Sequence, residues 1–195
     1  MRADRTKWDR RYKSGDRPHD GPPSEFLTRW LPYLPRGRGL DVATGLGRNA
    51  VLLAEAGYRV DAVDISSVGL GLAGARAAAR GTRIRWIEAD LDSWVPPADR
   101  YAVVVMAFYL NRKLMPRLLA AVRPGGVMIV ETHLRADREP CRSRYRLRPG
   151  ELRRQFAAWE ILELEEGKFG GGGHGVVSRI VAQRPGGRRL NTPCR

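Results

Sequence analysis

The pattern of apolar and polar residues changes at about residue 37. Beyond it, short apolar runs of strand length occupy 40–42, 58–63, 84–87, 101–106 and 127–131. Between them, apolar residues recur at helical spacing over 47–56, 66–80 and around 114–122. Strands that are apolar throughout are buried on both faces, so the alternation predicts a parallel sheet with helices on both sides, an α/β fold.

The amino-terminal 35 residues are predicted to form a helical lid. Trp8 and Tyr12 are four residues apart, as on one face of a short helix. Ser24 is placed to cap a second helix, which Pro32 and Pro35 end. Trp8 and Tyr12 either close over a bound cofactor or simply pack a short helix against the domain, and the pattern leaves both interpretations open.

The carboxyl-terminal part breaks the alternation. A helix is predicted near 150–157, followed by strands over 159–165 and 176–183 with no helix between them. Consecutive strands joined in this way form an antiparallel hairpin, here at the edge of the sheet. The expected organisation is one domain over 1–184, with the lid at 1–35 and the core at 36–184, before a disordered basic tail at 185–195.

Composition narrows the class of protein. The chain has 195 residues, 43% of them hydrophobic, with no apolar run of membrane-spanning length and no secretory leader. Two cysteines are too few for a disulfide scaffold or a structural zinc site, so no metal is expected. We therefore expect a soluble cytoplasmic protein, a monomer or homodimer, that makes no membrane contact.

The charge balance is strongly basic. Lysine and arginine total 35 against 21 aspartates and glutamates, a formal net charge of +14, and such an excess favours a nucleic-acid partner. Only four of these cations are lysines, however, and chains rich in arginine and alanine also arise from GC-rich genomes without selection for binding. A nucleic-acid partner is therefore allowed by the composition but not favoured by it.

The most informative segment is the turn between the first core strand and its helix, Asp41-Val42-Ala43-Thr44-Gly45-Leu46-Gly47-Arg48-Asn49-Ala50. Gly45 and Gly47 allow backbone conformations and a close ligand approach that a Cβ atom would prevent. Residues 45–50 also fit the G-x-G-x-x-A pattern of dinucleotide sites. The glycines alone therefore leave two kinds of cofactor open.

Three aspartates at consecutive strand ends favour a cofactor with a cationic amino group over a dinucleotide. Asp41 precedes the turn, where a carboxylate disfavours a pyrophosphate and favours a cationic amino group. Asp64 ends the second strand, placed for two ribose hydroxyls, and Asp90 follows the third, placed for an adenine amine. An ammonium, a ribose diol and an adenine together describe S-adenosylmethionine. Each aspartate alone is equally well a helix cap or a turn residue.

These residues resemble the class I S-adenosylmethionine-dependent methyltransferases. The D-x-x-x-G-x-G turn, the two later aspartates, the turn at 123–126 and the final hairpin stand in that family's order, over about residues 36–183. Ala43 departs from the family, most of whose members have glycine there. The resemblance implies a Rossmann-like doubly wound sheet in the order 3-2-1-4-5-7-6, with the last strand antiparallel.

The resemblance also implies which residues contact S-adenosylmethionine or its product S-adenosylhomocysteine. They are Asp41, Ala43, Thr44, Gly45, Gly47, Arg48, Asn49, Asp64, Ile65, Ser66, Asp90, Leu91, Ala107 and Phe108.

Within the class, the chain is most similar to the small methyltransferases of the tellurite-resistance type. This similarity is carried by Trp8-Asp9, Tyr12, Gly47-Arg48-Asn49, Pro140-Cys141, residues 150–154 and Trp159-Glu160. It implies methyl transfer to a small anionic or soft nucleophilic acceptor, such as a tellurium or selenium oxyanion or a thiol.

The acceptor is expected beyond the fourth and fifth strands. Residues 132–155 carry eight arginines against three carboxylates, and planar guanidinium groups suit oxyanions, although a solvated arginine-rich loop explains the same run. His133 and His174 are candidate catalytic bases with Arg179 as a partner, although surface histidines fit the sequence equally well. The candidate acceptor-binding residues are Tyr12, Tyr109, Arg135, Arg144 and Tyr145.

Two other functions compete with this one. RNA or DNA methylation fits the net charge, but the fourth strand ends in Ala107-Phe108-Tyr109-Leu110, without the N/D-P-P-Y motif that holds a flipped base. A non-catalytic dinucleotide-binding module fits the glycines, but Asp41 argues against it. Small-molecule methyl transfer is therefore the leading prediction, nucleic-acid methylation the second and the binding module the third.

Overall fold

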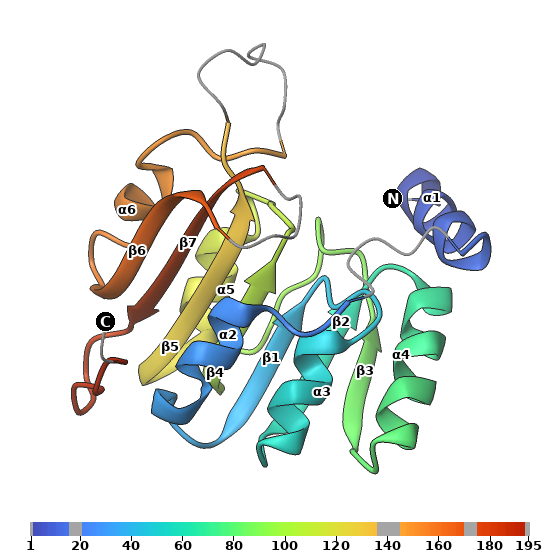
Figure 1. The fold of residues 1–195 in the computed structure, drawn as a ribbon, viewed down its shortest axis with the longest axis horizontal. Coiled ribbons are helices and arrows are strands. Elements are labelled where there is room, and N and C mark those ends of the chain that lie inside the picture. Colours follow the sequence, from blue (N-terminus) through green and yellow to red (C-terminus); the bar gives the residue numbers. More distant parts are fainter. Residues whose placement is uncertain (1, 16–20, 136–144, 170–174, 194–195) are drawn as a thin grey trace.

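A computed structural model describes residues 2–15, 21–135, 145–169 and 175–193. Its centre is one seven-stranded sheet in the order β3-β2-β1-β4-β5-β7-β6, the predicted order (Figure 1). The strands are β1 (Arg38–Val42), β2 (Arg59–Asp64), β3 (Ile84–Glu88), β4 (Tyr101–Ala107), β5 (Val122–His133), β6 (Glu160–Lys168) and β7 (Val176–Gln183). β1 to β5 pair in parallel, whereas β7 runs antiparallel to both β5 and β6, which confirms the predicted edge hairpin.

Helices cover the sheet from both sides. They are α1 (Arg2–Lys13), α2 (Glu25–Trp30), α3 (Arg48–Glu55), α4 (Ser67–Ala79), α5 (Met115–Ala121) and α6 (Glu151–Gln155), with a 3₁₀ turn at Leu31–Tyr33. On one face, α2 and α3 bury Trp30 and Leu53 against the sheet; on the other, α5 and α6 bury Leu118 and Phe156. Figure 1 shows α3 and α4 side by side, with α1 beyond the carboxyl-end edge of the sheet above α4.

Serine caps hold the amino-terminal ends of α2 and α4, and the cap at Ser24 is the one predicted above. The hydroxyl of Ser24 accepts a hydrogen bond from the Leu27 N–H (3.3 Å), and that of Ser66 from the Gly69 N–H (3.0 Å). Each side chain satisfies a backbone donor that the first helical turn leaves without a partner. The position of both helices is therefore encoded locally.

The sequence predicts helices on both faces of the sheet, but in the structure one face of β3 is only partly covered. Residues 89–100, which connect β3 to β4, contain turns and no helix. Leu91 and Trp94 from this connection pack on the upper half of the sheet face, near the carboxyl ends of the strands. The lower half of β2 and β3 on that face has no helix over it in the part of the chain that the structure describes.

The tail that the sequence predicts to be disordered lies in part against the sheet. The Gln183 side-chain amide donates to the Arg188 carbonyl (2.8 Å), and its oxygen accepts from the Leu190 N–H (3.2 Å). Leu190 packs against the core beneath α2 and α3. Among the described residues, no helix combines the length and the apolar character needed to cross a bilayer.

Candidate active site

The glycine turn after β1 lies at the point where the strand order reverses between β1 and β4. The Thr44 N–H donates to the Val63 carbonyl of β2 (3.0 Å), which ties the turn to the neighbouring strand. Gly45 and Gly47 adopt positive φ angles of 55° and 74°. A Cβ on Gly47 would lie 2.9 Å from both Ala73 and Trp86, so this position requires glycine.

Ala43 occupies the position at which the family has glycine, and its φ is 53°. Phe108, at the end of the adjacent strand β4, has a φ of 54°. L-residues adopt this conformation at a cost of roughly 1–2 kcal/mol, and such positions cluster at functional sites. Two of the three described non-glycine residues with left-handed backbones thus stand at the ends of neighbouring strands, at the switch point.

Asp41 is turned into the glycine turn. Its Oδ2 accepts hydrogen bonds from the Thr44 hydroxyl (2.5 Å) and the Ala50 N–H (3.1 Å), which fixes the start of α3. Burial raises the pKa of Asp41 to about 7, although both hydrogen bonds oppose the shift. This carboxylate therefore holds the turn in shape, and a nearby cation would stabilise its ionised form.

Asp64 connects the turn to the start of α4. Its Oδ2 accepts from the Gly45 N–H (2.8 Å) and its Oδ1 from the Ser66 N–H (3.0 Å). Burial raises the pKa of Asp64 as well, against the effect of these hydrogen bonds. Each carboxylate oxygen can accept two hydrogen bonds, so the Asp64 carboxylate retains accepting capacity for a ligand hydroxyl. Ile65, another predicted contact, follows directly in this segment.

Helix α1 closes on this side of the site. Asp9 accepts from the Ser66 hydroxyl (2.5 Å), and the Tyr12 ring lies 2.8 Å from where a Cβ of Gly69 would stand. Tyr12 is buried, and its pKa is raised first by burial and then by the charge of Asp64. Tyr12, predicted from the sequence to bind the acceptor, thus lies beside the glycine turn and Asp64. The role of Asp9 was not predicted, because nothing local links it to residue 66.

A network of polar side chains follows β3 and β4. The Asp90 carboxylate accepts from the Asp92 N–H (3.0 Å), and the Asn111 amide donates to Asp92 (2.8 Å) and to the Tyr109 hydroxyl (3.3 Å). Burial raises the pKa of Tyr109, and the charges of Asp92, Asp90 and Asp64 add to the shift. Tyr109 therefore stands near the Asp90 side of the site, together with buried Leu91. Asp92 and Asn111 were not singled out from the sequence.

A second group of side chains stands where β4 and β5 end. Ala107 is the last residue of β4, and the rings of Phe108 and His133 lie 5.4 Å apart between centroids, tilted by 55°. The Arg48 guanidinium is 5.7 Å from the Phe108 ring and donates to the Pro22 carbonyl (2.9 Å). Burial lowers the pKa of Arg48, while the charges of Asp41 and Glu131 oppose the shift.

Several residues that the sequence assigns to the site make contacts within the fold. The Asn49 side chain accepts from the Ser24 N–H (3.0 Å), which joins α3 to α2. The Arg179 guanidinium donates to Glu165 (2.6 Å) and lies 4.8 Å from the Phe26 ring. Arg135 bonds through its backbone to Leu147, and the Tyr145 side chain is 55% exposed. His174 and Arg144 lie outside the described residues, as does Cys141.

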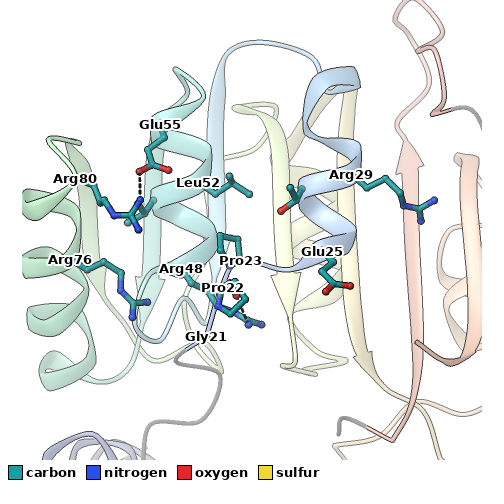
Figure 2. Close-up of a pocket in the computed structure, with 12 residues that line it drawn as sticks. Gly21, Pro22, Pro23, Glu25, Arg29, Arg48, Leu52, Glu55, Arg76 and Arg80 are labelled. Atoms are coloured by element: carbon teal, nitrogen blue, oxygen red, sulfur yellow. Dashed lines mark hydrogen bonds and ion pairs between the residues drawn. The ribbon is translucent and has the colours of Figure 1, made fainter. Parts of the chain in front are cut away.

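A groove of about 840 Å³ runs along the outside of the helix layer, between α2, α3 and α4 (Figure 2). Arg29, Arg48, Arg76 and Arg80 line it together with Glu25 and Glu55. Arg80 pairs with Glu55 across the groove (3.2 Å). Neither Asp41 nor Asp64 lines the groove, but Arg48 does, and because Arg48 also lies beside Phe108, the groove adjoins the site at the strand ends through this one residue.

Comparison with known proteins places this geometry in a family. Residues 40–126 match the family model described as a methyltransferase domain. The matched segment belongs to this methyltransferase-domain family. The match covers the glycine turn, Asp64, Asp90 and Phe108, and the fold agrees with the same class.

Curated relatives resemble part of this chain. It is 31% identical over 136 residues to hemagglutinin 1 of Eikenella corrodens, which covers 65% of this chain and 45% of that protein. It is 33% identical over 115 residues to trans-aconitate 2-methyltransferase of Azoarcus sp. strain BH72, covering 57% of this chain and 44% of the relative. The chain thus spans less than half the length of these curated relatives.

Solved structures share the fold of this chain over most of its length. TehB of Haemophilus influenzae superposes with a TM-score of 0.69 at 18% identity, over 89% of this chain and 66% of that one. A structure solved for the conversion of a disulfide bond into a thioacetal group during echinomycin biosynthesis gives a TM-score of 0.70 at 22% identity, over 93% of both chains. At these identities the likeness concerns the fold.

The residues at the strand ends fit the methyl donor of this class. Asp64 has free accepting directions for a ribose diol, and Asp41 is a buried carboxylate whose ionised form a cationic amino group would stabilise. The positive φ angles of Gly45 and Gly47 keep side chains away from the turn. Among the described residues, no cluster of three metal-ligating side chains occurs.

Proposed function

We propose that this protein transfers the methyl group of S-adenosylmethionine to a small acceptor that is anionic or a soft nucleophile. The observation that carries the proposal is the position of Phe108, His133 and Arg48, which gather where β4 and β5 end beside the glycine turn. An apolar ring, an imidazole and a guanidinium suit the positioning of a small oxyanion or thiol. A tellurium or selenium oxyanion is the acceptor class that we favour.

The chain's own residues divide the work. The donor supplies a methyl group on a cationic sulfur: the acceptor lone pair forms the new bond to carbon while the carbon–sulfur bond breaks and leaves its electrons on sulfur. Asp64 would hold the ribose hydroxyls, and Tyr12 would close the donor side. The Phe108 ring excludes water from the reacting carbon, and Arg48 balances the charge of the acceptor.

His133 is the candidate base in this scheme. A thiol or protonated oxyanion must lose a proton before or during methyl transfer, and an imidazole titrates in the right range to accept it. The ring stands 5.4 Å from Phe108 at the end of β5, where the acceptor is expected. His133 would therefore accept the acceptor's proton at a ring nitrogen.

An assay with labelled methyl groups tests the proposal. The protein is incubated with donor labelled on its methyl carbon and a pool of tellurite, selenite, small thiols and total RNA. Label is then counted in the headspace, in the soluble fraction and in the acid-precipitable fraction. We expect label in a volatile or soluble small product. Label only in the acid-precipitable fraction would instead assign the activity to a macromolecule.

A matched pair of variants separates enzyme activity from background. Asp64→Asn removes the charge at the donor side and is expected to abolish most of the product. Asp99→Asn makes the same chemical change at an exposed residue that pairs with Arg184 at the opposite edge of the sheet, and Asn tolerates its φ of 52°. If both variants lost activity equally, the donor site would not be where we place it.

A further inference from the structure

The amino ends of β1, β2 and β3 carry a row of arginines. Arg38 of β1 is the register partner of Arg59 of β2. Arg83 directly precedes Ile84, which pairs with Val60, so Arg83 continues the row on β3. Residues in one row of a parallel sheet point to the same face. Three guanidinium groups therefore stand side by side at the edge opposite the donor site.

A second row adds to this charge. Arg85 of β3 pairs in register with Asp61 of β2, two residues above the first row and on the same face. Arg59, Arg83 and Arg85 are exposed, since the connection from β3 to β4 forms no helix that would cover them. These residues, with Arg38 and Asp61, line a shallow groove of about 350 Å³. We call Arg38, Arg59, Arg83 and Arg85 the sheet-edge patch.

Asp61, the carboxylate that lines the groove, already has hydrogen-bonding partners. Asp61 is fully buried, accepts from Arg38 (2.9 Å) and the Tyr101 hydroxyl (3.0 Å), and lies 3.9 Å from Arg100. Within the described part of the chain, no carboxylate pairs with Arg59, Arg83 or Arg85. Like charges directly opposite each other weaken a sheet. Arg38 has its partner in Asp61, whereas an anionic partner would offset the mutual repulsion of Arg59, Arg83 and Arg85.

The shape of the patch indicates what kind of anion fits. A small phosphate needs enclosing donors, but this groove is open and its arginines are exposed. With strands ~4.8 Å apart, the row from Arg38 to Arg83 is about 10 Å wide. A duplex strand presents a phosphate every ~3.4 Å of its axis, so it would meet several guanidinium groups. Trp86 points to the other face, towards Gly47, so β3 offers no ring here for base stacking.

We propose that the sheet-edge patch binds the phosphate backbone of nucleic acid, independently of sequence and at the edge of the sheet opposite the methyl-transfer site. The patch concentrates part of the chain's net charge of +14 on one uncovered face. Basic residues clustered on one face of a chain with a pI near 10.9 are typical of such binding. This surface does not depend on whether methyl transfer occurs.

Fluorescence anisotropy with the full chain tests the proposal. The probes are a labelled 20-nucleotide single-stranded RNA and a DNA duplex of the same length, each titrated at several salt concentrations. The triple variant Arg59→Gln/Arg83→Gln/Arg85→Gln is expected to bind about tenfold more weakly at low salt, with the slope of log affinity against log salt reduced by about 2. The RNA and duplex arms identify which form binds.

A control of equal charge decides whether the patch or the net charge acts. Arg153→Gln/Arg154→Gln/Arg188→Gln also removes three exposed arginines, all outside the patch, and is expected to change affinity less than twofold. Equal losses in both triples would overturn the proposal, as would competition by a few millimolar phosphate or preferential binding to vesicles of anionic lipid. The melting temperature of the patch variant should equal or exceed that of the wild type. Arg83→Gln alone tests the loss of nucleic-acid affinity with a smaller change to the protein.

Discussion

The two halves of the methyl-transfer site are built differently. On the donor side, Asp41 and Asp64 are buried and hydrogen-bonded to the backbone of the glycine turn, so the shape of the site depends on main chain and glycine. On the acceptor side, Phe108 and His133 are half-buried side chains at the ends of two strands. A donor shared by a whole family needs a fixed cradle, whereas an acceptor is selected by side chains that vary at little cost to the fold.

The largest effect expected from this division is at His133. His133→Gln removes the candidate base and should lower kcat by about a thousandfold, within the range for general-base catalysis. The Kd for S-adenosylmethionine should change less than twofold, because His133 lies on the acceptor side. Steady-state kinetics and calorimetry measure the two quantities.

A control at the other end of the same strand checks that β5 itself is unharmed. Arg123→Gln changes a side chain that donates to the Arg36 carbonyl, far from the site along β5, and should leave kcat within twofold. If His133→Gln weakened donor binding as strongly as it lowered kcat, the two halves would not be separable.

The next effect concerns pH and the donor side alone. The pKa of Asp41 is about 7 in the folded protein and near 4 when unfolded, so the folded state binds more protons between these values. Folding stability should therefore fall as pH rises from about 4 to 7, by up to about 4 kcal/mol, and then level off. Asp64, whose pKa is also raised, contributes in the same direction.

Asp41→Asn isolates this contribution. An amide oxygen can still accept from Thr44 and Ala50 but carries no charge to be desolvated. Urea unfolding at pH 5 and pH 8 measures the free energy of unfolding. Between these pH values it should fall less for the variant than for the wild type. At pH 8 the variant should be the more stable of the two. Parallel losses in both proteins would mean that Asp41 is not the titrating group.

The prediction for Tyr12 tests which half α1 serves. The sequence assigns Tyr12 to the acceptor, but the ring packs on Gly69 and beside Gly45. Tyr12→Ala should raise the Kd for S-adenosylmethionine about tenfold, equivalent to ~1.4 kcal/mol, and leave the acceptor KM unchanged. Tyr12→Phe keeps the ring and should bind donor within twofold of the wild type, as should Lys13→Ala on the same helix. A change in acceptor KM alone would restore the sequence-based assignment.

What the sequence predicts well is local. The glycine turn, the cap at Ser24 and the strand order follow from periodicity, from residues within three positions of each other and from the family resemblance. Contacts between distant segments were not predictable in the same way. Asp9 meets Ser66 across 57 positions, and Arg38 meets Arg59 only through the register of two strands. Neither relation leaves a pattern in a single sequence.

The uncovered face of β3 was missed for a related reason. The alternation of strands and helices along the chain predicts helices on both sides of the sheet, and it does not single out the connection from β3 to β4 as an exception. Leu91 and Trp94 instead fold back as turns onto the upper half of the sheet. Arg59, Arg83 and Arg85 are exposed because no helix forms in this connection. Composition and net charge do not reveal that the helix is missing.

The smallest expected effect is at Ala43, where the donor half departs from its family. A left-handed alanine costs roughly 1–2 kcal/mol, but glycine loses about 0.5–1 kcal/mol more backbone entropy on folding. The Ala43 methyl also packs against the core, and its removal offsets part of the gain. Ala43→Gly should therefore stabilise the protein by no more than about 0.5 kcal/mol, or roughly 1–2 °C in Tm.

The sign of this small shift is informative beside a matched substitution. Ala54→Gly makes the same chemical change within α3, where φ is helical, and should destabilise by about 1 kcal/mol. If Ala43→Gly destabilised by as much, the methyl packing would outweigh the backbone strain, and alanine would be the better residue at this turn. Because φ at residue 43 is 53°, we expect the two substitutions to change the free energy of unfolding in opposite directions. The turn tolerates alanine because Asp41 and Asp64 hold the rest of its backbone.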